Sequence, residues 1–236
     1  MRSKPYPPGV PSTGMENQMT LKIDLYWSFR SPYSYIVLPR ILALVRDHDV
    51  EVALRIVHPA AIRNPSYFDH MDPLARPYFF KDTARAAAFQ GLAFRRPVPD
   101  PIVQDPINLA LATEHPLAQR LGRLGIAAVE AGKGLAFASE VADLLWSGAV
   151  DNWHEGTHLA RAAARAGLDL ADLDRTIDRH SDRLDAALAE NDVALRKAGH
   201  WGVPTMVFGD EVFFGQDRFD LLAWRLRHNG LAPRNR

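Results

Sequence analysis

Two serines stand at a predicted turn between a strand-like segment and a helix-like segment. Ser31 is followed by Pro32, and Ser34 comes one helical turn later. A hydroxyl at the beginning of a helix lies beside backbone N–H groups without partners, at the positive end of the helix dipole, where an anion is stabilised. Because the chain contains no cysteine, the sulfur of any thiolate bound here would have to come from a ligand.

The simpler interpretation of the same turn is structural. Serine is a preferred N-cap, and proline is favoured at the first helical position because its missing N–H leaves no bond unmade there. Ser31 would then only cap the helix that Pro32 begins. We expect Ser34, inside the first turn, to make a local hydrogen bond with the backbone.

A second pattern could bind a metal. Residues 154–158 read HEGTH, which matches the H-E-x-x-H pattern of zinc peptidases, where two histidines share one helix face and the glutamate acts as general base. Gly156 weakens a helix, and Arg161 stands where the longer zinc motif has glycine. The pattern also lies at the predicted beginning of a helix. We therefore expect no zinc chemistry and no metal.

The composition argues against several classes of function. The 236 residues include 28 basic and 28 acidic side chains, so no net charge attracts nucleic acid or an anionic membrane. No apolar run approaches the roughly 20 residues of a membrane helix. Residues 1–20 contain four prolines and no apolar signal-peptide core, and are predicted to be a flexible tail. A cytoplasmic location is the expectation.

The segments around Ser31 predict a β-α-β unit. Residues 21–29 are rich in β-forming side chains, an apolar helical stripe follows Pro32, and residues 50–59 form a second strand. Such a unit implies that the two strands pair in parallel.

The middle of the chain, residues 64–198, carries no strand signal. Its alanine-rich segments predict five helices that end at glycines. These helices are expected at residues 73–90, 105–132, 135–146, 154–166 and 170–197.

Strands return near the carboxyl end of the chain. Residues 206–208 and 211–213 flank the hairpin dipeptide Gly209-Asp210, and a closing helix begins at Asp217. Residues 21–63 and 199–230 should therefore form one discontinuous domain around a single sheet. Residues 64–198 would be a helical domain inserted into it.

This order of elements resembles the DsbA-like branch of the thioredoxin superfamily. The chain is most similar within it to the 2-hydroxychromene-2-carboxylate isomerases and kappa-class glutathione transferases. Three motifs carry the resemblance: SPYSY (31–35), GVPT (202–205) and FFGQDRFDLLAWRL (213–226). It extends over residues 21–226, most weakly in the helical part, and implies an α/β DsbA-like thioredoxin fold with an inserted all-helical domain.

The resemblance also implies positions for a glutathione site. Ser31 and Ser34 stand where redox members of the fold have two cysteines. Pro204 would be cis and would face Ser31, and the backbone of Val203 would pair with the cysteinyl part of glutathione. Asp217 and the preceding Gln216 would hold the γ-glutamyl end, although these families have serine or asparagine where Gln216 stands.

Further contacts are expected from polar and aromatic side chains. Asn64, with Lys81 or Arg85, would meet the carboxylates of the tripeptide and the second substrate, and ordinary surface roles are the alternative. Aromatic side chains could wall the substrate pocket, although buried aromatics usually belong to the core. The candidates for this wall are Trp27, Tyr33 and Trp201.

The function implied is that of a glutathione-dependent isomerase of the 2-hydroxychromene-2-carboxylate isomerase type. It would act on an intermediate of aromatic catabolism through a glutathione thiolate stabilised by Ser31, as a cytoplasmic homodimer. A kappa-like glutathione transferase and a non-catalytic DsbA-like binding protein are the alternatives. The presence of both Ser31 and Asp217 favours an enzyme.

Overall fold

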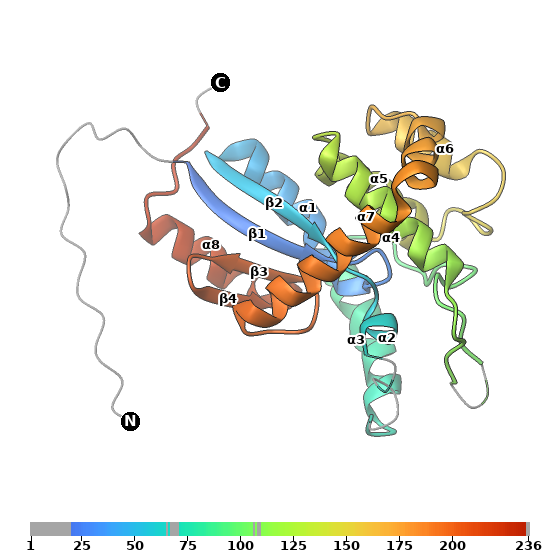
Figure 1. The fold of residues 1–236 in the computed structure, drawn as a ribbon. Helices are drawn as coiled ribbons and strands as arrows, with labels where there is room; N and C mark the ends of the chain where they lie inside the picture. The colour runs from blue at the N-terminus through green and yellow to red at the C-terminus, as the bar shows by residue number, and fades with distance from the viewer. Residues whose placement is uncertain (1–19, 65, 67–70, 106, 108–109, 235–236) are drawn as a thin grey trace.

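A four-stranded mixed sheet organises the molecule (Figure 1). The computed structural model describes residues 20–64, 66, 71–105, 107 and 110–234, so nearly all of the predicted tail lies outside the described residues. The strand order is β2-β1-β3-β4. As predicted, β1 pairs in parallel with β2, and β3 and β4 form an antiparallel hairpin, with β3 antiparallel to β1. The strands are β1 (Leu21–Trp27), β2 (Val50–Ile56), β3 (Thr205–Phe208) and β4 (Glu211–Phe214).

Helices connect and cover these strands. Helix α1 (Pro32–Asp47) joins β1 to β2, and α8 (Phe219–His228), preceded by the short 3-10 helix η2 (Gln216–Arg218), closes the chain. The helices between β2 and β3 are α2 (Ala60–Arg63), α3 (Ala75–Phe89), α4 (Pro116–Glu130), α5 (Gly134–Trp146), α6 (His158–Arg165) and α7 (Leu170–Ala198).

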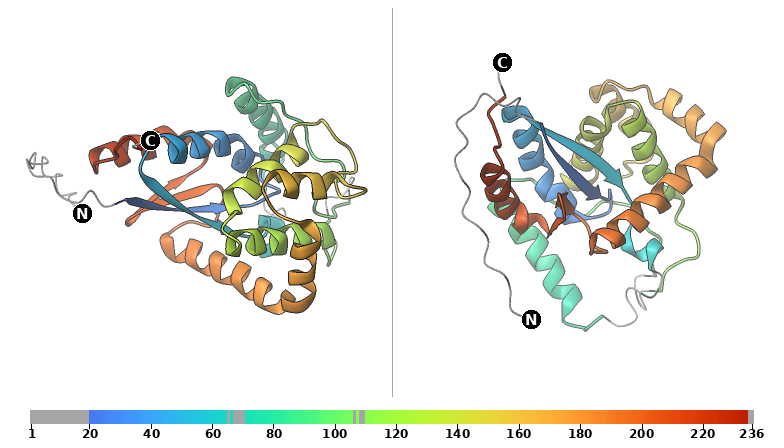
Figure 2. Two further views of the ribbon diagram at one scale, coloured as in Figure 1. Left: turned by 90° about the horizontal axis from the view of Figure 1, so that it is seen from above. Right: turned by 60° about the vertical axis from the view of Figure 1, so that its left-hand side comes forward.

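The two faces of the sheet carry different helices. Helices α1 and α8 lie on one face, and α7 lies on the other (Figure 2). Helix α7 packs along α4, and both contact β2. The inserted helices and the sheet share one hydrophobic core, which joins Trp27 and Ile56 of the strands to Phe137 of α5 and Leu184 of α7.

Four predicted helices begin later than the sequence pattern indicates, and two of them, α4 and α6, differ by more than two residues. Helix α4 begins at Pro116 and not at residue 105, because proline fits the first helical position and ends any helix that approaches from before it. In place of that first part, Gln104 and Leu111 form an isolated β-bridge. Helix α6 begins at His158 and not at residue 154. Within the described part of the chain, no helix is long and apolar enough to cross a membrane.

Candidate active site around Ser31

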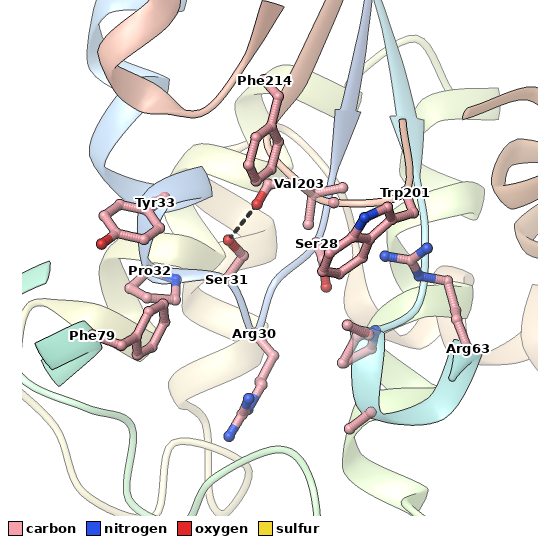
Figure 3. A pocket seen from close by; sticks show the side chains of 14 residues that line it. Ser28, Arg30, Ser31, Pro32, Tyr33, Arg63, Phe79, Trp201, Val203 and Phe214 are labelled. Atoms are coloured by element: carbon pink, nitrogen blue, oxygen red, sulfur yellow. Dashed lines mark hydrogen bonds between the residues drawn. The ribbon is translucent and has the colours of Figure 1, made fainter. Parts of the chain in front are cut away.

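The hydroxyl of Ser31 links the beginning of α1 to the loop before β3. Ser31 is the N-cap of α1, with Pro32 at the first helical position, and its Oγ accepts a hydrogen bond from the Ser34 N–H at 3.2 Å. The same Oγ donates to the carbonyl oxygen of Val203 at 3.2 Å (Figure 3). The same hydroxyl therefore caps α1 and connects this helix to the loop that contains Val203.

The Val203–Pro204 peptide bond is cis, as the resemblance predicted. The preceding loop is held by Thr205, whose hydroxyl donates to the carbonyl of Gly202 at 2.7 Å. Gly202 also permits a close approach, since a Cβ atom there would lie 2.5 Å from the ring of Phe214. These contacts place the Val203 carbonyl against the turn that carries Ser31.

A cavity of about 240 Å³ opens in front of Ser31. Tyr33 and Phe79 line one side of it, and Trp201 and Arg63 line the other (Figure 3). These four side chains come from α1, α3, the loop before β3 and α2. The cavity is thus built where the thioredoxin-like sheet meets the beginning of the helical insertion.

The aromatic side of the cavity is fixed by Asp82. The Tyr33 hydroxyl donates to Asp82 Oδ2 at 2.6 Å, and the Tyr33 ring packs edge-on against Phe79 at 5.5 Å between centroids. Burial, followed by the hydrogen bond and charge of Asp82, raises the pKa of Tyr33. Tyr33 therefore presents a neutral phenol and an apolar ring to the cavity.

Arg30 places a cation beside Ser31, and this cation is already paired with Asp100. Its guanidinium forms two hydrogen bonds of 3.0 Å with Asp100, which also accepts from Arg96 at 3.0 Å. Burial alone would raise the pKa of Asp100, but the charge and hydrogen bonds of Arg30 and the N–H of Ile102 lower it overall. Arg30 thus anchors the turn to residue 100 of the following loop.

Two polar atoms of the cavity wall have no hydrogen-bond partner among the described residues. Ser28 is 1 % exposed, and its Oγ has no hydrogen bond among the described residues. The Arg63 side chain is 6 % exposed, and its Nη2 likewise has no partner among them. Sequence reasoning missed both residues, although Ser28 lies in the same turn as Ser31 and Arg63 directly precedes the predicted Asn64.

Only part of the predicted site lies together. Ser31, Tyr33, Trp201 and Val203 line the cavity, and Pro204 directly follows Val203. The other predicted side chains lie outside its lining: Asn64, Lys81, Arg85, Gln216 and Asp217.

The predicted residues outside the lining have other contacts or are exposed. Gln216 Oε1 accepts from Arg40 at 2.7 Å, so this side chain joins η2 to α1. Asp217 is 61 % exposed and lies 3.5 Å from Arg218. Asn64 accepts from the Ser66 hydroxyl, and Lys81 and Arg85 are exposed on α3. Their roles in ligand binding stay predictions.

The expectation for Ser34 is wrong, and for Trp27 the alternative of a core position is the one that holds. The hydroxyl of Ser34 makes no local backbone bond; it is buried without a partner among the described residues, and only its N–H bonds to Ser31. Trp27 does not line the cavity in front of Ser31. Its ring is fully buried, and its Nε1 donates to the carbonyl of Ser34 at 3.0 Å, because β1 directs it into the core beneath α1.

The HEGTH segment does not have the geometry of a zinc helix. His154 lies in a turn and His158 is the first residue of α6, so the two do not share a helical face. His154 Nε2 lies 3.6 Å from the carboxylate of Glu155. Among the described residues, no group of three or more histidine, cysteine or acidic side chains is arranged to hold a metal ion.

Comparison with known proteins identifies the class to which this fold and turn belong. A family profile for the DSBA-like thioredoxin domain matches residues 22–227. The chain therefore belongs to the family of DSBA-like thioredoxin domains. No curated protein matches the chain.

Solved structures with the same fold include enzymes of different kinds. A 2-hydroxychromene-2-carboxylate isomerase is 20 % identical, with a TM-score of 0.66 over 88 % of this chain and 95 % of that one. A probable DsbA oxidoreductase from Streptomyces coelicolor is 17 % identical, with a TM-score of 0.63 over 89 % of each chain. The cytosolic disulfide reductase DsbM from Pseudomonas aeruginosa is 16 % identical, with a TM-score of 0.57 over 88 % of this chain and all of its own. DsbM has also been solved with GSH.

Proposed function

We propose that this chain is a glutathione-dependent enzyme in which Ser31 stabilises the glutathione sulfur as a thiolate. One observation carries the proposal: the Ser31 hydroxyl, which caps α1, donates to the Val203 carbonyl at the wall of a cavity. The chain has no cysteine, so it cannot exchange disulfides through a thiol of its own as a dithiol oxidoreductase would. A ligand must supply the sulfur.

The residues of the cavity fit a charged peptide ligand. The unpaired polar groups of Ser28 and Arg63 would stay unsatisfied beside a purely apolar molecule, and that is costly for buried donors. A tripeptide with two carboxylates offers acceptors to both. The backbone carbonyl of Val203 offers an acceptor to the main chain of such a peptide, in the manner of an added strand.

The role of Ser31 follows from its two present hydrogen bonds. Its oxygen accepts from the Ser34 N–H, which leaves one hydroxyl proton to donate. That proton now goes to the Val203 carbonyl. With a thiolate bound, the hydroxyl would rotate toward the sulfur and release the Val203 carbonyl to a peptide N–H. A hydrogen bond to an anion is roughly twice as strong as one between neutral groups, so this exchange is favourable.

The reaction proposed is an isomerisation of the 2-hydroxychromene-2-carboxylate isomerase type, on an aromatic intermediate. When bound, glutathione would supply a nucleophilic sulfur that adds to an electrophilic carbon and leaves again after rotation about the loosened bond. Tyr33, Phe79 and Trp201 would hold the aromatic group. Similarity in fold to such an isomerase supports this reaction. Transfer of glutathione without its release is the alternative outcome at the same site.

The remaining parts of the proposal rest on the family resemblance. Gln216, Asp217 and Asn64 would contact glutathione, and Lys81 or Arg85 would meet the second substrate. The enzyme would be a cytoplasmic homodimer. Similarity to a cytosolic disulfide reductase that has been solved with GSH supports both the compartment and the ligand.

Calorimetric titration tests the proposal. The matched ligand is the tripeptide in which alanine replaces the cysteine of glutathione, since it keeps both charged ends and lacks the sulfur. We expect glutathione to bind, and the alanine tripeptide to bind about tenfold more weakly above the thiol pKa, because it makes no bond with Ser31. No binding of glutathione, or equal binding of both peptides, would contradict the proposal.

A further inference from the structure

Arg63 is the last residue of α2 and is held on two of its three nitrogens. Its Nε donates to the carbonyl of His58 at 2.7 Å, and its Nη1 pairs with Asp192 of α7. Its Nη2 is buried and has no partner among the described residues. Figure 3 shows Arg63 at the wall of the cavity, beside Trp201.

The charges around Arg63 do not balance. Asp192 also accepts a hydrogen bond from Arg196 at 3.0 Å, so two guanidinium groups share one carboxylate. Burial lowers the pKa of Arg63, and Asp192 only partly opposes this effect. Because a buried cationic donor without a partner is costly, an anion at Nη2 would complete the site.

Arg30, the other arginine of the cavity wall, provides a contrast. Its Nε and Nη2 both donate to Asp100 at 3.0 Å, so one edge of this guanidinium already binds a carboxylate in the paired geometry that arginine favours. Arg63 instead has Nε and Nη1 bonded within the chain and Nη2 without a partner among the described residues, in a side chain that lines the cavity.

The hydroxyl of Ser28 is the second unpaired donor. It is buried at the end of β1 and lines the same cavity, between Ser31 and the Trp201 side in the close view (Figure 3). Tyr33 and Phe79 lie on the opposite side of Ser31. The unpaired donors therefore lie only on the Trp201 side of Ser31, and aromatic rings line both sides.

We infer that Arg63 Nη2, with the hydroxyl of Ser28, binds a carboxylate of the ligand. This subsite deepens the proposed function by dividing the ligand: the aromatic part lies against Tyr33, the reacting atom at Ser31 and the carboxylate at Arg63. The carboxylate can come from glutathione or from an aromatic acid that serves as second substrate. Both sources present the same chemistry to the guanidinium.

The competing explanation is that Arg63 only fastens α2 to α7 through Asp192. Two variants separate the roles. Arg63→Gln removes the charge from the cavity as well as the ion pair, whereas Asp192→Asn weakens the ion pair and leaves the Arg63 charge in place. Arg63→Lys provides a further variant that keeps a cation near Asp192 but loses the second donor nitrogen, should Arg63→Gln fail to fold.

The experiment is calorimetric binding of two pairs of probes to the full chain. One pair is glutathione and its diester, and the other is 2-hydroxycinnamate and its methyl ester. In one of the two pairs, the carboxylate of the acid occupies the subsite. For that pair we expect wild-type protein to bind the acid roughly tenfold to a hundredfold more tightly than its ester. Arg63→Gln or Arg63→Lys should reduce this preference at least tenfold, and Asp192→Asn should retain it.

Three results would overturn the inference. These are no preference for either acid in wild-type protein, a preference that survives in the Arg63 variants, and an equal loss of preference in Asp192→Asn. Failure of the proposed function looks different. If glutathione does not bind but the aromatic acid binds in an Arg63-dependent way, the subsite stands and the glutathione proposal falls.

Discussion

Ser31 and Ser34 carry the same side chain one turn apart, yet their hydroxyl groups have different environments. The Ser31 hydroxyl has two hydrogen-bond partners and faces the cavity. The Ser34 hydroxyl is buried against the core and has none among the described residues. A buried hydroxyl without a partner costs free energy, so Ser34 contributes through its backbone, whose N–H bonds to Ser31 and whose carbonyl accepts from Trp27.

Replacement of Ser34 by alanine should therefore stabilise the protein. The Ser34→Ala variant removes the unsatisfied hydroxyl, keeps the N–H that Ser31 accepts, and places a better helix former in α1. We expect the free energy of unfolding to rise by about 1 kcal/mol in chemical denaturation. A decrease of similar size would show that the hydroxyl makes a bond that this account lacks.

Sequence reasoning found residues of the site that share a motif. Ser31 and Tyr33 lie in one turn, and Val203 precedes a proline in GVPT, so local patterns identify them. Arg63 and Phe79 could not be found in this way, because their approach to Ser31 depends on how α2 and α3 pack. Trp27 is the converse case: this aromatic residue is close in sequence to Ser31 but lies wholly in the core, and the sequence left both positions open.

At the scale of elements, the approach of α4 to the sheet depends on a glycine. A Cβ atom at Gly125 would lie 2.8 Å from the ring of Phe29 and 3.1 Å from the side chain of Ile56. Phe29 cannot easily move, because its ring packs edge-on against Trp27 at 4.7 Å and Phe137 at 6.0 Å between centroids. Gly125 thus lets α4 lie directly on β2.

Gly125→Ala should destabilise the protein even though alanine favours helices. The gain in helix propensity is about 1 kcal/mol, whereas overpacking a core usually costs about 1–3 kcal/mol, so the clash should prevail. We expect a lower melting temperature and a lower free energy of unfolding in thermal and denaturant titrations. Unchanged or greater stability would mean that α4 can shift away from β2 at little cost.

The sequence predicted most elements because their signals are local. Alternating apolar residues predict β1 and β2, and alanine-rich segments predict α5 and α7. The observed bounds of these four elements lie within a few residues of the predicted ones. The beginning of α4 is predicted too early, at residue 105, because leucine and alanine also occur before Pro116. The described residues Gln104 and Leu111 instead form an isolated β-bridge, and Pro116 begins α4.

In three histidines from different parts of the molecule, burial lowers the pKa because it disfavours the protonated, charged form. His58, His115 and His200 have pKa values lowered from 6.5, and burial is the largest cause for each. They lie in different parts of the structure: after β2, before α4 and before β3. In His115 the Nδ1 atom accepts the N–H of Val103 at 3.0 Å, a bond that protonation of Nδ1 would break.

The protein should lose stability as the pH falls below about 6.5. At pH values between the lowered histidine pKa of the folded protein and the ordinary pKa of the unfolded chain, the unfolded chain binds protons that the folded protein does not. A fall in pH therefore favours unfolding. Each such histidine contributes a slope of up to about 1.4 kcal/mol per pH unit. Stability is complete above the ordinary histidine pKa and declines below it.

Denaturant titrations at about pH 7.5 and 5.5 measure this loss. In His115→Asn, the side-chain oxygen can accept the Val103 N–H but does not titrate in this range. The variant should therefore show a smaller difference in the free energy of unfolding between the two pH values. An equal difference in wild type and variant would mean that His115 does not contribute.

If Ser31 holds a glutathione thiolate, the pKa of the bound thiol depends on the Ser31 hydroxyl. Ultraviolet absorbance of the thiolate follows this pKa in glutathione complexes of wild-type and Ser31→Ala protein. A hydrogen bond to a charged group is worth about 1.5–3 kcal/mol, and one pKa unit corresponds to about 1.4 kcal/mol.

We therefore expect the bound thiol to have a lower pKa than free glutathione in wild-type protein. Ser31→Ala should raise that pKa by about one unit and reduce turnover at least about tenfold. The fold should survive, because loss of the cap costs only about 1 kcal/mol. If glutathione binds to Ser31→Ala with an unchanged thiol pKa and normal turnover, Ser31 is only a helix cap and the proposed mechanism is wrong.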